Sequence, residues 1–126
     1  MKTSYFLIFL ALYGFITGGM LLFNPSGSLE NFGIIASDKY HILIIQYLGI
    51  ADIGLSIILL LSRNSSDNHS IRNILIGLAF ILISNVLKGF YDVLIGQIPA
   101  NTYFWADYSF TLLVGFACIY FALKKP

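Results

Sequence analysis

Six polar side chains of this sequence have types that could bind a ligand or move a proton, although they stand in or beside strongly apolar segments. They are His41, Asp52, Asn85, Lys88, Asp92 and Asp107. A carboxylate in a medium of low dielectric constant readily takes up a proton, an ammonium group binds anions, and an amide both donates and accepts hydrogen bonds. Within a membrane, such side chains usually mark a binding site or an ion pathway. These six residues form the candidate ligand-binding site.

The sequence carries no recognisable catalytic or metal-binding pattern. The single cysteine, Cys118, and the two histidines do not form a Cys/His set with zinc-ligand spacing. No Ser/His/Asp constellation and no glycine-rich phosphate loop is present either. The sequence therefore predicts no catalytic residue and no metal site, and it identifies no cofactor.

The composition places most of the chain in a lipid bilayer. Of the 126 residues, 58% are hydrophobic and only 10% are charged, and the mean hydropathy is +0.84. Soluble domains are usually about half apolar and about a quarter charged. The net charge of +1 provides no basic surface for nucleic acid. The sequence predicts a membrane protein with the lipid bilayer as its first partner and no nucleic-acid partner.

Four apolar segments have the length of membrane-spanning helices. They cover roughly residues 4–23, 40–61, 71–96 and 103–123, each long enough to cross about 30 Å of hydrocarbon. A longer loop opened by Asn24-Pro25 follows the first segment, a short polar turn follows the second, and Pro99 interrupts the chain after the third. The sequence predicts an all-α fold, a four-helix transmembrane bundle forming one domain over residues 1–126.

The orientation of this bundle follows from its basic residues, which gather on the cytoplasmic side of membrane proteins. One side of the predicted membrane carries Lys2, Arg63, Arg72, Lys124 and Lys125. The other side carries Lys39, with Lys88 embedded in a span. Both termini are therefore predicted to face the cytoplasm.

Among the charged residues, Asp52 is the hardest to explain as a surface group. It stands about 18 Å from the start of its span at Tyr40 and about 14 Å from its end at Leu61. A short side chain at that depth does not reach water. Its charge costs from about 2.5 kcal/mol upward unless the carboxyl group is protonated or paired. We expect another polar group within the bundle to meet this carboxylate.

The helical period indicates which groups those are. His41, Gly49, Asp52 and Ser56 share one face of the second span, while Gly77, Ser84, Asn85, Lys88 and Asp92 share one face of the third. Asn85 stands at nearly the same depth as Asp52, and Lys88 stands one turn nearer the outside. The sequence predicts a network of Asp52 with Asn85 and Lys88 in an outward-facing polar pocket with an apolar floor.

Several of these residues also have a simpler explanation, which stays open. Lys88 and Asp92 are close enough to the end of their span for the charged groups to reach the headgroups, Asp107 lies near the outer surface, and His41 stands at a helix start. The aromatic residues Tyr103, Phe104, Trp105 and Tyr108 fit an interfacial belt, with a ligand-facing wall as the alternative. The Gly14-to-Gly18 spacing favours close helix packing, either within the bundle or between copies.

The order of these parts resembles the DoxX-like family of small four-helix bacterial membrane proteins. The matching features are a glycine-containing first helix that runs into FNPSGSLENFGI, the segment LGIADIGLSIILL, two further helices and a basic tail. By position, the resemblance touches Pro25, Gly49, Asp52 and Gly54. It implies a multi-pass protein of the bacterial inner membrane, of a kind proposed as accessory subunits of quinol-linked oxidases or redox stress systems. Lys88 with Asp92 matches no feature of the family.

Three classes of function remain open. The first is a non-catalytic accessory or partner-binding subunit, which assembles with other membrane subunits or with copies of itself. The second is a binding protein or carrier for a small, possibly lipidic molecule. The third is a membrane isomerase in which an embedded carboxylate shuttles a proton. An ion channel is disfavoured, because the spans are apolar on the cytoplasmic side of Asp52 and Asn85.

Overall fold

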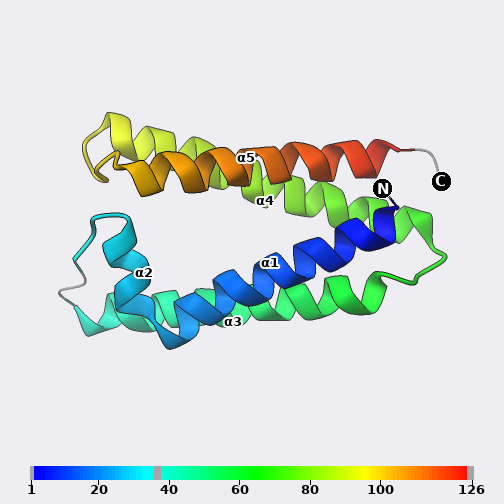
Figure 1. Cartoon of the computed structure of the whole chain (residues 1–126), viewed down its shortest axis with the longest axis horizontal. Coiled ribbons are helices and arrows are strands. Elements are labelled where there is room, and N and C mark those ends of the chain that lie inside the picture. The colour runs from blue at the N-terminus through cyan, green and yellow to red at the C-terminus, as the bar shows by residue number, and fades with distance from the viewer. Residues whose placement is uncertain (1, 36–37, 125–126) are drawn as a thin grey trace. The chain divides into compact units, whose positions relative to one another are not determined.

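The computed structural model describes residues 2–35 and 38–124 of the chain (Figure 1). Its helices are α1 (Thr3–Phe23), α2 (Pro25–Asn31), α3 (Lys39–Ser62), α4 (Asn68–Leu94) and α5 (Thr102–Leu123). No strand occurs in these described ranges, so the predicted all-α class is confirmed. Helices α1, α3, α4 and α5 are long and apolar enough to cross a membrane, as a multi-pass membrane protein requires.

The predicted spans agree with α1, α3 and α5 to within one residue at each end, but α4 differs. It begins at Asn68 rather than at residue 71, because Asp67 caps it. One carboxylate oxygen of Asp67 accepts a hydrogen bond from the backbone N–H of Ser70 at 3.2 Å, and the other accepts one from the Ser70 hydroxyl at 2.6 Å. This satisfies N–H groups that the first turn of a helix leaves without partners. The polar turn before α4 is therefore shorter than predicted.

The other end of α4 is set by Gly96. The helix ends at Leu94 rather than at residue 96, and Gly96 has a φ of 78°. A positive φ suits glycine, which has no Cβ to clash with the backbone. The N–H groups of Gly96 and Gln97 then turn back to the carbonyl oxygens of Val93 and Asp92 at 3.1 and 2.8 Å. These are the two bonds of a Schellman motif, which stops the helix.

Helix α2 lies within the loop that the sequence predicts between the first two spans, so that prediction was wrong for Pro25–Asn31. The side chain of Asn24 caps the helix by accepting a hydrogen bond from the N–H of Gly27 at 3.3 Å. Pro25 fits the first turn because its missing N–H would have no partner there. Gly33, with a φ of 75°, ends the segment in a second Schellman motif. These start and stop residues are visible in the sequence.

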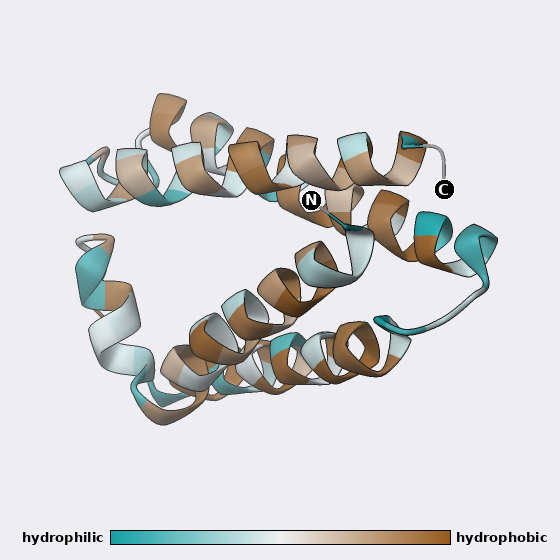
Figure 2. Ribbon diagram, turned by 45° about the vertical axis from the view of Figure 1, so that its right-hand side comes forward, coloured by the Kyte–Doolittle hydropathy of each residue, from teal (hydrophilic) through white to brown (hydrophobic). Residues whose placement is uncertain are grey.

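The chain divides into two compact units, Met1–Ser65 and Ser66–Pro126. In the first unit α1 packs along α3, with α2 at the junction between them, and in the second unit α4 packs along α5 (Figure 1). Hydrophobic residues follow the long helices, and hydrophilic residues gather in the connection between α3 and α4 (Figure 2). That the whole chain forms one domain, with both termini cytoplasmic, stays a prediction. Lys125 lies outside the described residues.

Candidate functional site

Small residues bring α1 and α3 into close contact around the first candidate residue. A Cβ on Gly18 would lie 2.7 Å from the carbonyl oxygen of Gly49, and a Cβ on Gly49 would lie 2.6 Å from the carbonyl oxygen of Gly18. A Cβ on Gly14 would overlap the hydroxyl of Ser56. The spacing of Gly14 and Gly18 therefore serves packing within the chain, a point that the sequence left open. We call this contact the α1·α3 seam.

Asp52 lies on the edge of the α1·α3 seam. Its Cβ is 3.0 Å from the position that a Cβ on Gly18 would take, and its side chain is half-buried. Its backbone carbonyl accepts a hydrogen bond from the Ser56 hydroxyl at 2.9 Å. The carboxylate itself makes no hydrogen bond or ion pair with any residue in the described ranges. It therefore stands beside a close helix contact without a polar partner among the described residues.

The depth of Asp52 in the membrane can also be judged from its neighbour on α1. Along α3 alone it is near mid-span, but Gly18 is only about 8 Å from the end of α1 at Phe23. The side-chain N–H of Gln46 donates to the carbonyl oxygen of Leu22 at 3.1 Å, which fixes this register. Consequently the first two turns of α3 extend past the end of α1. Measured along α1, Asp52 therefore lies in the half nearer the α1–α2 junction, whereas along α3 it lies slightly nearer Ser62.

Asn85 and Lys88 stand away from the contact between α4 and α5. A Cβ on Gly89 would overlap the ring of Tyr108, and Ile83 packs against Gly115. At 100° per residue, Lys88 lies on the opposite side of α4 from these contacts, and Asn85 lies at their edge. Both side chains are exposed, and Asn85 makes no side-chain hydrogen bond within residues 2–35 and 38–124. The polar face predicted for this span is thus left uncovered by α5.

The structure brings two of the predicted site residues together, because the ammonium of Lys88 forms an ion pair with the carboxylate of Asp92. The Lys88 side chain is 67% exposed and that of Asp92 is 16% exposed. The ammonium also lies 5.6 Å from the centre of the Tyr91 ring, within range of a cation–π interaction. Lys88 therefore already has a local counter-charge. Its participation in a network with Asp52 stays a prediction.

The aromatic residues of α5 form a cluster with Phe90 of α4, which the sequence did not single out. The rings of Phe104 and Tyr108 have centroids 4.3 Å apart, and Phe90 lies 5.9 Å from Trp105. Phe104 is fully buried, whereas Trp105 is 51% exposed. Phe104 therefore packs the core rather than a belt, whereas Tyr103 and Trp105 are exposed, as interfacial residues would be.

The remaining two candidates differ in their surroundings. Asp107 is half-buried in the second turn of α5 and makes no hydrogen bond or ion pair with a residue that the structure describes. His41 is exposed in the first turn of α3, where its backbone N–H donates to the carbonyl oxygen of Asp38 at 3.2 Å. The simpler explanation, a helix-start residue, fits His41. The carboxyl group of Asp107, like that of Asp52, has no hydrogen bond or ion pair among the described residues.

No group of three or more His, Cys, Asp or Glu side chains within the described ranges could hold a metal ion. Comparison of the chain with protein-family models, curated proteins and solved structures gives no match. The DoxX-like resemblance is therefore still a prediction. What the candidate site could bind is therefore inferred from the side chains of this chain alone.

Proposed function

We propose that this protein is a small integral membrane protein that acts as a non-catalytic accessory or partner-binding subunit, and that it holds its partner through polar groups within the spans. The observation that carries the proposal is the carboxylate of Asp52, which lies half-buried at the α1·α3 seam without a hydrogen bond or ion pair among the described residues. An unpaired carboxylate in hydrocarbon is costly unless it is protonated, so a polar group from elsewhere that meets it would stabilise it.

Asn85 supports the proposal from the second unit, because it is exposed on the side of α4 that α5 leaves free. Amide and carboxyl groups within membranes hydrogen-bond across helices. The predicted network of Asp52 with Asn85 and Lys88 would match these groups within the chain, and a polar residue on a partner helix would match them between chains. The connections between α3 and α4 and between α4 and α5 are short, so the spans offer most of the surface for a partner. The DoxX-like resemblance implies the same accessory role in the bacterial inner membrane.

A binding protein for a small or lipidic molecule is the second candidate, and Asp107 favours it. This half-buried carboxylate has no hydrogen-bonding or ionic partner among the described residues, and it stands between Trp105 and Tyr108 of the aromatic cluster in the chain. A carboxylate beside apolar rings suits a ligand with one polar group on an apolar body. A membrane isomerase would need the same carboxylates as proton carriers.

Affinity purification in mild detergent separates the two candidates. We expect a partner to copurify in stoichiometric amount with the wild-type protein and with the Asp38→Asn variant, since Asp38 lies outside the spans at the start of α3. Asp52→Asn should weaken the association about tenfold, the effect of losing about 1.4 kcal/mol. Equal recovery with Asp52→Asn would contradict the proposal. A purified protein without a partner, whose melting temperature a lipid extract raises only when Asp107 is intact, would favour the binding protein.

A further inference from the structure

Helix α2 is tied to the end of α1 rather than hanging free. Ser28 is buried, and its hydroxyl donates to the carbonyl oxygens of Asn24 at 2.9 Å and Met20 at 3.3 Å. These bonds occupy carbonyl groups at the end of α1, which a helix terminus otherwise leaves exposed. Figure 1 shows α2 turned across the direction of α1 and α3. If α1 and α3 cross a bilayer, α2 therefore lies along its surface.

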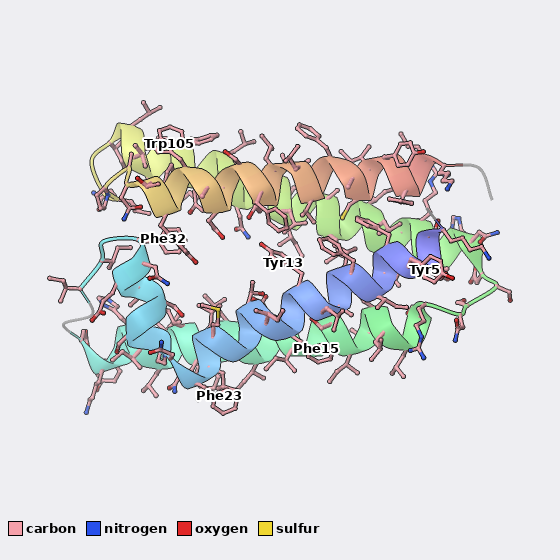
Figure 3. The ribbon with its side chains drawn as sticks, viewed as in Figure 1. Tyr5, Tyr13, Phe15, Phe23, Phe32 and Trp105 are labelled. Atoms are coloured by element: carbon pink, nitrogen blue, oxygen red, sulfur yellow. The ribbon has the colours of Figure 1, made fainter. Side chains whose placement is uncertain are left out.

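Two large apolar side chains flank α2 and are almost fully exposed. Phe23 is 84% exposed and Ile35 is 85% exposed. Phe23 ends a stripe of exposed apolar residues that runs down α1, made up of Leu12, Ile16 and Met20. Its ring projects away from the α1·α3 pair (Figure 3). Leaving such a side chain in water forfeits its burial free energy, which contact with lipid would recover.

Between these two side chains, α2 presents polar residues. Ser26, Glu30 and Asn31 are exposed, whereas Leu29 is half-buried. The Schellman motif after α2, in which the N–H of Ile34 donates to the carbonyl oxygen of Leu29 at 3.0 Å, fixes the backbone that leads into Ile35. The segment therefore combines a polar face with two apolar ends that are held in place.

The start of α3 carries residues typical of a membrane interface. Because Gln46 meets the last turn of α1, the first two turns of α3 lie beyond the end of α1, at the level of α2. Tyr40 is 62% exposed and Tyr47 is 70% exposed, and the ammonium of Lys39 lies 5.4 Å from the centre of the Tyr40 ring. Tyrosine and lysine at the ends of spans anchor them at the headgroups.

We propose that the segment Phe23–Ile35 binds the headgroup layer of one leaflet. Helix α2 lies in that layer with its polar face toward water, and Phe23 and Ile35 reach the boundary of the acyl chains. Amphipathic helices at interfaces sink by about 5–10 Å, which is within reach of these side chains. The lipid surface is favoured over a protein partner because Phe23 continues the exposed apolar stripe of a membrane-spanning helix. This assignment does not depend on the proposed function.

Tryptophan quenching tests the proposal directly, because Trp105 is the only tryptophan in the chain. In a Trp105→Phe background, a reporter is placed by Phe23→Trp, Ile35→Trp or, as the matched control on the polar face, Glu30→Trp. Each variant is reconstituted in phosphatidylcholine nanodiscs that carry bromine atoms either close to the headgroup or near the chain end. Acrylamide serves as the quencher from water.

We expect the reporters at positions 23 and 35 to be quenched more strongly by bromine close to the headgroup than by bromine near the chain end, and the reporter at position 30 to be quenched by acrylamide. Quenching of the position 35 reporter by acrylamide alone would overturn the proposal, because the segment would then stand in water. Strong quenching of the position 30 reporter by bromine near the chain end would overturn it too, since α2 would then enter the membrane. Should Phe23→Trp not fold, Tyr40→Trp gives the same measurement at the same level.

Discussion

Gly18 of α1 and Gly49 of α3 lie so close that the carbonyl oxygen of each fills the space that a side chain on the other would need. The two hypothetical Cβ atoms would lie 2.7 and 2.6 Å from those oxygens, and real Cβ contacts of this length essentially never occur. The neighbouring atoms belong to helix backbones, which cannot shift like a flexible side chain. This contact positions Asp52 beside α1 and fixes the register of the first unit.

Gly18→Ala should therefore lower the free energy of unfolding by about 1–3 kcal/mol, the usual effect of overpacking a tight contact. Gly19→Ala is the matched control, because a Cβ there meets nothing within 4 Å. That variant should be neutral or more stable, since alanine favours helix by up to about 1 kcal/mol. Reversible unfolding in mixed detergent micelles measures both. Equal stability of the two variants would contradict the α1·α3 seam.

In the second unit, Gly89→Ala should also destabilise, because a Cβ there would overlap the Tyr108 ring. The expected loss is about 1–3 kcal/mol. Tyr108→Ala relieves the overlap, so the double variant should be more stable than the sum of the single losses implies, by about 0.5–3 kcal/mol. Gly77→Ala, which meets nothing within 4 Å, is the control. Strict additivity would show that the two residues are not in contact.

The Lys88–Asp92 ion pair should have a small coupling energy, because the lysine side chain is largely exposed. A double-mutant cycle of Lys88→Met and Asp92→Asn in detergent should give about 0.2–0.5 kcal/mol. High salt should reduce that value by screening the charges. The cycle of Arg72→Met with Asp92→Asn is the control, because these residues are about 30 Å apart along α4 and should not couple. A Lys88 coupling as small as this control would mean that the pair does not stabilise α4.

Acid should loosen the start of α4 through Asp67. The hydroxyl of Ser70, followed by its backbone N–H, lowers the pKa of the Asp67 carboxyl group. Since the folded pKa lies below the unfolded one, the stabilisation is complete above the unfolded pKa, about 3.9. It is then lost as the pH falls through the folded pKa.

Hydrogen exchange of the amides at the start of α4 measures this effect. Protection in the wild type should fall below about pH 4, whereas Asp67→Asn, which keeps a capping oxygen, should lose this part of the pH dependence. Ser70→Ala should move the loss of protection to higher pH, because the largest cause of the lowered pKa is removed. An identical acid profile in wild type and Asp67→Asn would exclude Asp67 as the titrating group.

The four long helices could be predicted from the sequence because each is a long, predominantly apolar run bounded by polar residues, proline or glycine. Their spans were predicted to within one residue at the ends of α1, α3 and α5. The errors at α4 and α2 concern capping, where Asp67, Asn24 and Gly33 carried signals in the sequence. The i, i+4 spacing also allowed Lys88 and Asp92 to meet on one helix.

By itself, then, the sequence predicted a lipid environment and the helices long enough to cross it, because hydropathy and helix length are properties of each segment alone. Only the tertiary structure decided what each helix face touches, since a contact depends on which helix lies opposite and in what register. It placed Gly18 against Gly49 and Tyr108 against Gly89, and it left the carboxyl group of Asp52 without a hydrogen bond or ion pair among the described residues. Hydrophobicity selects spans without selecting partners, because lipid is as apolar as a neighbouring helix.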